Sequence, residues 1–384
     1  MNPITVPLEE IFEAYYDCRK NKRKTLNALK FEVNYEDNCV QLWEEINNKT
    51  YEIGKSITFI VTKPKPREIF AADFRDRIVH HLIAKKLEPL FEKVFIEDTY
   101  NCRKGKGTLY GVIRLHDKIQ EVSENYTKDC YVAKFDMQGF FMSIHKPTLN
   151  KMLQTFIDDN YFNTDKSILK WLVEKVILHC PEKNCIRKSP KWKWNLVADN
   201  KSLFTNGSDY GLAIGNLTSQ LFANFYLRQF DDLMTKNFIC YGRYVDDFYI
   251  IDNKDRILNS INSIKDYLYN NLRITLHPDK IYIQHYTKGI KFTGMVVKKD
   301  RTYIGNATRS NFILKLKHFN YKNINHFISS VNSYLGYCNH HRSYNIKRKI
   351  MESVPKHIWK ECCYTSGIGK LKIIYTLKRK ICLE

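Results

Sequence analysis

The chain has no long apolar segment. No run within its 384 residues approaches the roughly 18 apolar residues that a membrane-spanning helix needs. Its first ten residues, MNPITVPLEE, contain two acids and lack the apolar core of a signal peptide. We therefore expect a protein with neither a membrane segment nor a secretion signal.

Paired cysteines and flexible linkers are also missing. The 11 cysteines include no CxxC pair, and scattered thiols in odd number are typical of a reducing compartment. The nearest approach to a zinc site is Cys180 and Cys185 with His179, and no further ligand at suitable spacing is evident. Internal repeats, low-complexity tracts and Gly/Ser-rich linkers are absent too. We expect a cytoplasmic, globular protein without structural zinc.

Negative charge is scarce. The chain has 62 Lys and Arg against 41 Asp and Glu, a net charge of +21. Residues 301–384 hold sixteen Lys and Arg and three Asp and Glu, a net +13. Aromatic residues are interleaved with these cations: Phe319, Tyr321, Phe327, Tyr334, Tyr337 and Tyr344. Cations that hold phosphates beside aromatics that stack bases indicate a nucleic-acid partner, although a solvated helical face gives the same pattern. An acidic membrane surface is the weaker alternative.

The apolar periodicity predicts an α+β fold. Helical spacing extends over residues 7–47, 74–94, 107–122, 166–180, 216–234, 257–272 and 324–345, with a break expected near Pro89. Strands are predicted over 56–70 (a pair with a turn at 64–66), 130–137, 238–252 (a hairpin), 280–284 and 290–297. This order of elements favours helices packed around a mostly antiparallel sheet.

Two adjacent carboxylates interrupt a strand-like segment, RYVDDFYIID at 243–252. Asp246 and Asp247 repel one another, and burial of either one without a partner is costly. A two-residue hairpin turn favours Asn-Gly or Asp-Gly, because its central residues need positive φ, so Asp-Asp is a poor turn sequence in itself. An exposed acidic turn or a bound divalent metal would each offset the repulsion.

A third carboxylate ends another apolar strand, in CYVAKFDMQGFF at 130–141. Asp136 would be an ordinary strand end if it stood alone. Phosphoryl transfer by two metals, however, needs carboxylates that clamp ions about 3.5–4 Å apart, and Mg²⁺ prefers oxygen ligands. Asp136, Asp246 and Asp247 could hold two Mg²⁺ (or Mn²⁺) ions, whose charge would turn the repulsion into attraction. We predict that these three residues are the metal ligands and catalytic groups.

The order of the motifs resembles that of reverse transcriptases. FDMQGFF, GLAIGNLTSQLFANFYL, RYVDDF, LHPDK and KFTG follow one another as the palm motifs of that family do. REIFAADFRDRIVHHLI and YNCRKGKGTLYGV resemble its fingers motifs in the bacterial, group II intron-like branch. The resemblance spans roughly residues 55–345. It implies a right-hand polymerase with fingers at 1–110, a palm at 111–303 that carries the catalytic carboxylates, and a basic helical thumb at 304–384.

The segment IGNLTSQ at 214–220 narrows the resemblance. Most relatives have Gln before the Gly and Pro after the Ser, whereas this chain has Ile214 and Gln220. The variant is similar to the reverse transcriptases of diversity-generating retroelements, which copy a template-repeat RNA into cDNA with errors opposite adenine. That resemblance implies a bacterial or phage-encoded RNA-directed DNA polymerase for mutagenic retrohoming, with template RNA, cDNA, dNTPs and a small basic oligomeric accessory protein as partners. A retron-type or phage-defence reverse transcriptase is the nearest alternative.

The resemblance also implies roles for single residues. It implies dNTP contacts by Lys63, Arg67, Arg75, Phe141, Ile214, Gly215, Gln220 and Lys280. Within this set Phe141 would exclude a ribose 2′-hydroxyl, Gly215 would let the backbone approach the nucleotide, and Lys280 would protonate pyrophosphate. Contacts with nucleic acid are expected from Arg103, Lys347, Arg348 and Lys349. Surface charge and core packing are the ordinary alternatives for these positions, and a catalytically inactive RNA-binding scaffold is the alternative for the whole chain.

Overall fold

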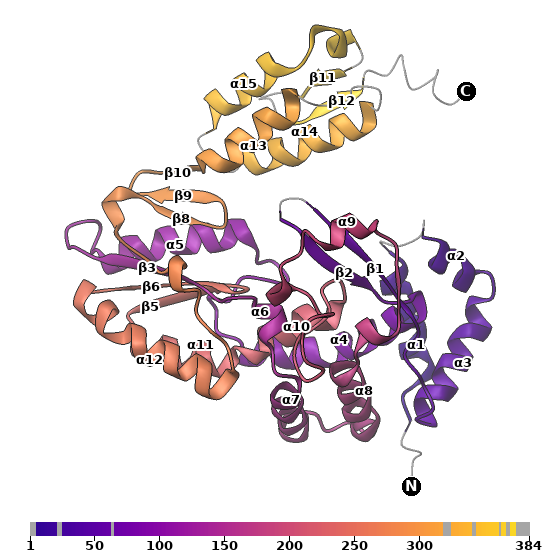
Figure 1. Ribbon diagram of the computed structural model, residues 1–384. Helices are drawn as coiled ribbons and strands as arrows, with labels where there is room; N and C mark the ends of the chain where they lie inside the picture. The colour runs from indigo at the N-terminus through magenta and orange to yellow at the C-terminus, as the bar shows by residue number, and fades with distance from the viewer. Residues whose placement is uncertain are drawn as a thin grey trace. The chain divides into compact units, whose positions relative to one another are not determined.

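The computed structural model describes residues 5–20, 25–62, 65–317, 324–339, 343–360, 362–365 and 369–373. The fold is α+β, as predicted, with the elements labelled in Figure 1. The chain forms two compact units, the first from residues 1–105, 134–249 and 255–282, and the second from 106–133, 250–254 and 283–384. These cuts differ from the predicted fingers, palm and thumb boundaries, which stay a prediction. No helix of the described residues is long and apolar enough to cross a bilayer.

Helices dominate the start of the first unit, as predicted for residues 7–47. They are α1 (Leu8–Arg19), α2 (Leu26–Glu32) and α3 (Tyr35–Asn47), followed after a strand pair by α4 (Phe74–Val94). The predicted break near Pro89 is wrong, because α4 continues through it. Phe91 lies just beyond the proline, is fully buried and stacks on Phe225 with ring centres 4.6 Å apart. Packing of this kind offsets the hydrogen bond that proline removes from a helix.

A three-stranded sheet lies in the same unit, with the order β2-β1-β4. The predicted strand pair is β1 (Ser56–Val61) and β2 (Arg67–Ala71), which run antiparallel. The third strand, β4 (Cys185–Arg187), pairs parallel with β1 and was not predicted. Three residues are too few to show a strand periodicity, so only the tertiary fold reveals this pairing.

The sheet that carries the predicted carboxylates has the order β5-β6-β3-β7. Its strands are β3 (Tyr131–Asp136), β5 (Cys240–Tyr244), β6 (Asp247–Asp252) and β7 (Tyr282–His285), which confirms the predicted strand at 130–137 and the hairpin at 238–252. Phe135 and Phe248 are both fully buried and stack with ring centres 4.8 Å apart. The strand ends that bear the acids therefore rest on a packed aromatic layer.

The predicted helix over 216–234 is two helices, α10 (Leu217–Tyr226) and α11 (Arg228–Asn237). They meet at Leu227, where φ is −90° and ψ is 0°. On either side of this junction, the Tyr226 hydroxyl donates to the Leu272 carbonyl at 2.8 Å and Phe230 packs edge-on against Phe248. Apolar periodicity alone does not reveal where one helix ends and the next begins.

Other helices complete the first unit. They are α6 (Phe140–Ser143), α7 (Lys146–Asn160), α8 (Lys166–Leu178), α9 (Lys191–Trp194) and α12 (Lys254–Leu272). The helices predicted over 166–180 and 257–272 are thereby confirmed, while α7 was not predicted. Helices α7 and α8 pack against one another, and the Gln154 side chain of α7 donates to the Lys170 carbonyl of α8 at 3.0 Å.

The second unit contains the predicted helix α5 (Thr108–Val122) and a sheet of order β10-β9-β8. The three strands are β8 (Ile290–Phe292), β9 (Met295–Lys298) and β10 (Arg301–Ile304). Three helices and a strand pair follow: α13 (Asn306–Lys317), α14 (Ile324–Cys338), α15 (Tyr344–Ser353), β11 (Cys362–Tyr364) and β12 (Leu371–Ile373). The single helix predicted over 324–345 ends at Cys338.

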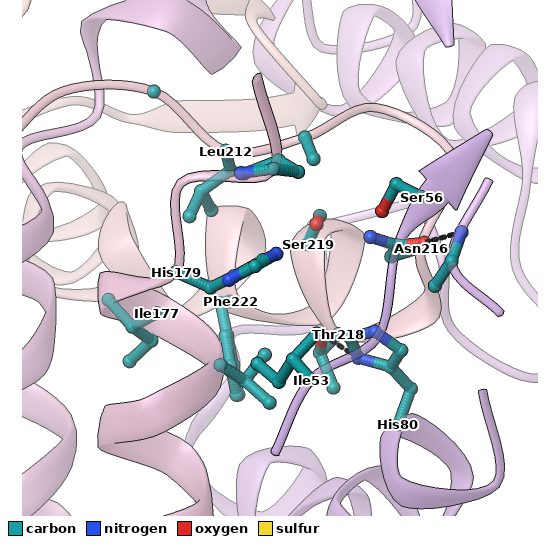
Figure 2. Close-up of a pocket in the computed structure, with 15 residues that line it drawn as sticks. Ile53, Ser56, His80, Ile177, His179, Leu212, Asn216, Thr218, Ser219 and Phe222 are labelled. Carbon is teal, nitrogen blue, oxygen red and sulfur yellow. Dashed lines mark hydrogen bonds between the residues drawn. The ribbon is translucent and has the colours of Figure 1, made fainter. Parts of the chain in front are cut away.

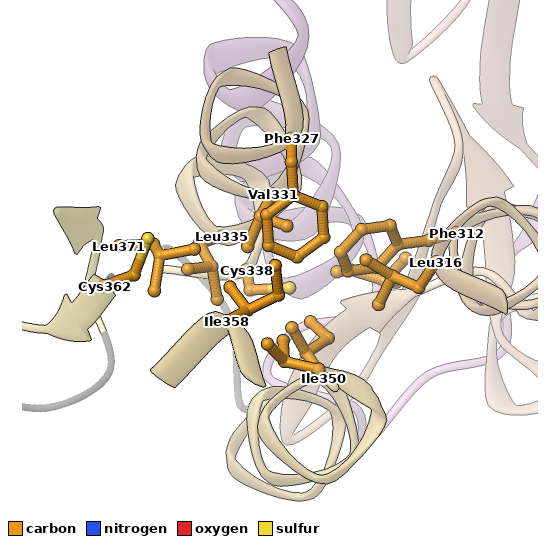
Figure 3. Close-up of a cluster of buried hydrophobic side chains, with 12 residues drawn as sticks. Phe312, Leu316, Phe327, Val331, Leu335, Cys338, Ile350, Ile358, Cys362 and Leu371 are labelled. Carbon is orange, nitrogen blue, oxygen red and sulfur yellow. The ribbon is translucent and has the colours of Figure 1, made fainter. Parts of the chain in front are cut away.

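An apolar cluster forms the core of this C-terminal part (Figure 3). Phe327 is fully buried in it, and Tyr334 stacks on Phe312 with ring centres 3.6 Å apart. The Tyr337 hydroxyl donates to the Thr293 carbonyl at 2.6 Å. Phe327 is thus a core residue and not a base-stacking group, whereas Tyr334 and Tyr337 are partly buried and Tyr344 is 70% exposed. Phe319 and Tyr321 lie outside the described residues.

A buried polar network occupies the core of the first unit beneath the β5–β6 hairpin. Arg243 of β5 is 0% exposed and Asp231 of α11 is 1% exposed, and their side chains form an ion pair at 2.5 Å and 2.7 Å. The Arg243 guanidinium also donates to the Asn224 side chain at 3.1 Å, and the Tyr241 hydroxyl donates to Asp231 at 2.6 Å. Two charges are tolerated in such a place only when their hydrogen bonds are made.

This network predicts a large stability difference between two neighbouring acids. Asp231→Ala leaves the Arg243 guanidinium buried without its counter-charge, so the free energy of unfolding should fall by about 3–5 kcal/mol. Asp232→Ala is the matched control, since its only described ion pair is a 3.8 Å contact with Arg228 near the surface and should be worth less than about 1 kcal/mol. Urea unfolding followed by circular dichroism measures both, and equal losses would contradict the role given to Asp231.

Candidate active site

The β5–β6 hairpin presents Asp246 and Asp247 through a strained turn. Val245, its first central residue, has φ of +60°, which a β-branched residue seldom adopts and which primed hairpin turns require. Its N–H donates to the Asn101 side chain at 2.9 Å, and its carbonyl accepts from the Arg243 guanidinium at 2.9 Å. These two hydrogen bonds offset the strain of the turn, which is of order 1–3 kcal/mol. The buried network thereby fixes the position of the two carboxylates.

The third carboxylate lies beside this turn. Asp136 is the last residue of β3, and the N–H of the next residue, Met137, donates to the Asp246 carbonyl at 3.2 Å. The Asp136 carboxylate acts electrostatically on both hairpin acids and raises the pKa of each. The structure therefore brings together the three carboxylates that the sequence singled out, on the ends of neighbouring strands.

Burial and mutual repulsion make this cluster unfavourable when all its members are ionised. Burial raises the pKa of Asp246 to about 6, and the charges of Asp136 and Asp247 add to the shift. The positive charge of Arg67, the exposed first residue of β2, acts in the opposite direction on the same pKa. Burial also raises the pKa of Asp247. Positive charge at this place would relieve the cluster.

Two lysines supply part of that charge. The Lys280 ammonium lies 2.7 Å from an Asp136 carboxylate oxygen, and the Lys134 ammonium lies 3.5 Å from an Asp247 oxygen. Lys280 was predicted to belong to the site, and Lys134 was not. The sequence does hold a signal for it, since Lys134 precedes Asp136 by two residues on one strand and must share its face.

The three carboxylates are suitable ligands for a divalent cation, but they are not spaced to share one in this structure. No group of three His, Cys, Asp or Glu among the described residues has the spacing of a metal site, which also holds for the region of Cys180 and Cys185. The donors of the cluster are all carboxylate oxygens, which Mg²⁺ prefers, and they lack sufficient counter-charge. A cation would fit here once the carboxylates exchange their lysine partners for it.

A second group of predicted residues gathers on an apolar cluster next to β2. Phe141 and Ile214 both pack against a buried cluster of Phe70, Met142 and Leu203, and the Phe70 N–H donates to the Ile214 carbonyl at 2.8 Å. Gly215 has φ of +127°, and a Cβ there would lie 2.8 Å from the Phe70 carbonyl oxygen. The structure therefore requires glycine here because the backbone passes close to β2. The sequence prediction gave a different reason, which was close approach to a nucleotide.

The remaining predicted dNTP contacts are spread more widely. Gln220 is exposed on α10 and accepts from the Cys102 thiol at 3.1 Å. Arg75 forms an ion pair with Glu45, and its guanidinium covers the Tyr51 ring at 5.2 Å. Arg75 is thus engaged within the helical N-terminal region and is not brought to the carboxylates. Lys63 lies outside the described residues.

The predicted nucleic-acid contacts differ sharply in accessibility. The Arg103 side chain is 4% exposed and donates to both oxygens of Glu92 and to the Ile96 carbonyl, so its guanidinium is occupied within the fold. The Lys347–Lys349 segment belongs to α15 in the second unit, where Arg348 and Lys349 are exposed. The structure leaves these cations accessible to a polyanion, whereas it gives Arg103 a structural role.

A small cavity behind the 211–216 segment is separate from the carboxylates. It measures about 30 Å³ and is lined in part by His80, His179, Thr218 and Ser219, which Figure 2 shows facing one another. The His80 ring nitrogen lies 2.7 Å from the Thr218 hydroxyl, and burial lowers the pKa of His80 to about 3. The volume suits one or two water molecules and is far too small for a nucleotide.

The polar groups that hydrogen-bond to the β5–β6 turn were not predicted from the sequence. Arg243 stands in the quoted RYVDD segment, and Asn101 and Asn224 stand in the quoted fingers and palm motifs, yet none was assigned a role. The available signal was a charged residue at an inward position of an apolar strand, CYGRY. Such a residue needs a buried counter-charge, here Asp231.

Comparisons with known proteins agree with this geometry. The family model described as "Reverse transcriptase (RNA-dependent DNA polymerase)" matches residues 55–297. No curated protein sequence matches the chain.

Solved telomerase structures resemble the chain at low identity. Apo telomerase from Candida tropicalis, truncated from its C-terminal domain, is 13% identical with a TM-score of 0.48, over 66% of this chain and 55% of that one. The apo enzyme from the same species is 11% identical with a TM-score of 0.49, over 80% and 57%. Candida albicans telomerase in complex with a TWJ fragment of telomeric RNA is 12% identical with a TM-score of 0.48, over 80% and 57%. The matched part thus spans little more than half the length of each telomerase chain.

The family match rests on sequence and covers more than half of the chain. It includes both strand ends that carry the three carboxylates, the segment with Phe141 and Ile214, and Lys280. The chain therefore belongs to the reverse transcriptase family of RNA-dependent DNA polymerases.

Proposed function

We propose that the chain polymerises DNA on an RNA template and that Asp136, Asp246 and Asp247 are its catalytic carboxylates. The observation that carries the proposal is the meeting of these acids at the end of β3 and at the β5–β6 turn. All three lie within the segment that the reverse transcriptase model matches. In this proposal residues 1–110 are the fingers, 111–303 the palm and 304–384 the thumb.

The carboxylates would hold two Mg²⁺ ions. Bound there, such ions would neutralise the triphosphate and lower the pKa of the primer 3′-hydroxyl, which attacks the α-phosphate while pyrophosphate leaves. Side chains of the protein would bind the triphosphate and assist the leaving group. Arg67 and Lys63 would hold the triphosphate, and Lys280, released from Asp136, would donate a proton to the departing pyrophosphate.

Further substrate contacts are proposed within each unit separately. Phe141 would stand against the 2′ position of the incoming sugar, with Ile214, Gly215 and Gln220 near the nascent base pair. On α15, Lys347, Arg348 and Lys349 would hold the phosphate backbone of the template–primer duplex, which a protein grips through shape and charge rather than sequence. Accessibility of Arg348 and Lys349 supports this assignment.

Replacement of one carboxylate tests the catalytic proposal. Asp246→Ala should lower primer extension on an RNA template by at least about a thousandfold, because several kcal/mol of transition-state stabilisation is lost. Affinity for the template–primer should persist, since it depends on basic residues elsewhere. Asp266→Ala, an exposed acid on α12, is the control and should extend primers normally. Extension by Asp246→Ala at a rate near the wild type would refute the assignment.

Two adjacent phenylalanines separate sugar selection from packing. Phe141→Ala should open space beside the sugar and raise the use of rNTPs relative to dNTPs on the order of tenfold, because a steric barrier is removed. Phe140→Ala, whose side chain is 2% exposed, should lower stability without this change in selectivity. Competitive single-nucleotide incorporation measures both. A Phe141→Ala enzyme that loses activity with unchanged selectivity would mark Phe141 as a packing residue only.

The biological role we propose is that of a diversity-generating retroelement. The enzyme would make cDNA from a template-repeat RNA with errors opposite adenine, for mutagenic retrohoming, together with a small basic oligomeric accessory protein. Support comes from the IGNLTSQ segment, in which Ile214 and Gln220 replace the Gln and Pro of most relatives. A retron-type or phage-defence enzyme is the alternative, and paired template and variable repeats beside the gene would distinguish them.

Ile214 gives this role a direct test. Isoleucine offers the nascent base pair only its shape, which discriminates weakly compared with a site that hydrogen-bonds its ligand. Ile214→Gln should therefore lower misincorporation opposite template adenine more than opposite the other bases. Sequencing of cDNA made by both enzymes on one RNA measures the change. An unchanged adenine error rate in an active variant would limit Ile214 to its packing contact with the Phe70 cluster.

A further inference from the structure

A basic segment with exposed apolar side chains follows helix α8. Residues 181–207 contain six Lys and Arg against two Asp and Glu. Three large apolar side chains of this segment are unusually exposed: Ile186 by 50%, Trp192 by 60% and Leu196 by 47%. Trp192 therefore offers an aromatic ring that is largely open to solvent. Lys191 and Lys193 flank Trp192, and the Lys193 ammonium lies 5.5 Å from the centre of its ring.

The segment is firmly attached to the β2-β1-β4 sheet. Its strand β4 pairs with β1, and the Ser189 hydroxyl then accepts from the Ile60 N–H at 2.8 Å. Further along, Ser202 and Leu203 donate through a hydroxyl and an N–H to the buried carboxylate of Glu68, the latter at 2.9 Å. These contacts at both ends hold in place the part of the segment that carries the exposed side chains.

The two tryptophans of helix α9, in the sequence KWKW, have different surroundings. Trp194 lies against Phe204, and the Arg187 guanidinium covers both rings at 5.2 Å and 3.7 Å. The Trp194 indole N–H donates to the Ser189 carbonyl at 3.0 Å. Trp194 thus anchors the short helix, which leaves its neighbour Trp192 with an accessible ring.

The segment is also connected to the apolar cluster next to β2. Phe204 and Leu203 belong to the apolar cluster that also includes Phe141 and Ile214. In template-directed synthesis the template base that pairs next is still unpaired and lies directly ahead of the nascent pair. The basic segment that carries Trp192 is therefore attached to the same cluster that we propose lies beside the nascent pair.

We propose that Trp192, Lys191 and Lys193 form a binding site for the unpaired template RNA ahead of the nascent base pair. An unpaired base stacks on the Trp192 ring while the two lysines hold adjacent phosphates, the combination by which proteins bind single strands without sequence preference. Paired bases offer no free face for such stacking, so the site does not bind the duplex. The proposal rests on the proposed RNA-templated synthesis and adds a template contact to it.

Binding of two RNA–DNA hybrids tests the site. One hybrid carries a 5′ single-stranded template extension and the other is blunt, and fluorescence anisotropy without Mg²⁺ or dNTP gives each Kd. Trp192→Ala should weaken binding of the extended hybrid roughly tenfold and leave the blunt one unchanged. Trp192→Phe, which keeps a stacking ring, should restore most of the affinity. Tyr269→Ala removes a comparably exposed ring from α12, 57% accessible, and should change neither Kd.

Salt dependence tests the lysines separately. Replacement of Lys191 and Lys193 by Gln should lower the slope of log K against log salt by roughly 0.7 for each phosphate of the single strand that a lysine no longer neutralises. The proposal is overturned if Trp192→Ala binds the extended hybrid like the wild type, as a surface for a protein partner would, or if it weakens both hybrids equally. Because no catalysis is measured, failure of the carboxylate assignment would leave these results unchanged.

Discussion

The buried ion pair between Arg243 and Asp231 is the interaction on which the candidate site depends. It fixes the Arg243 guanidinium so that it can donate to the Val245 carbonyl, while Asn101 accepts from the Val245 N–H. Those two contacts hold a β-branched residue at φ of +60°, a conformation it would otherwise avoid. Asp246 and Asp247 are placed by this turn. A buried ion pair, which is itself costly to form, thus positions Asp246 and Asp247 although these two carboxylates repel one another.

The acids themselves are held against their own repulsion. Burial raises the pKa of both hairpin carboxyls, and the charge of Asp136, at the end of β3 beside the turn, adds to each shift. Lys280 pairs with Asp136 and Lys134 pairs with Asp247, whereas burial raises the pKa of Asp246 to about 6. A site that is unfavourable without added positive charge is suited to binding cations together with a polyphosphate. In that state Lys280 would be free to act on the leaving group.

Much of the fold and the centre of the site could be predicted from the sequence, because their signals are local. The strand ending at Asp136 and the hairpin around Asp246 show strong β propensity, and α4, α5, α8 and α12 show clear helical spacing. The features that the sequence did not reveal depend on partners elsewhere in the chain. Arg103 is engaged by Glu92, the thumb aromatic Phe327 fills a core, and Pro89 is tolerated because Phe91 packs on Phe225. The parallel pairing of β4 and the role of Arg243 were not predicted for the same reason, because a tertiary contact leaves no periodicity in the sequence.

The central claim, that the carboxylate cluster is unfavourable until a cation binds it, is tested by the stability of Asp246→Asn. A carboxyl whose pKa is about 6 when folded and ~3.9 when unfolded lowers stability once ionised, so its cost is absent below about pH 4 and complete above about pH 7. In EDTA at about pH 8, the variant should therefore be more stable than the wild type by roughly 1–2 kcal/mol, and the difference should vanish near pH 4. Mg²⁺ should then raise the melting temperature of the wild type and not that of the variant. A less stable variant at pH 8 in EDTA, or an equal response of both proteins to Mg²⁺, would contradict the account.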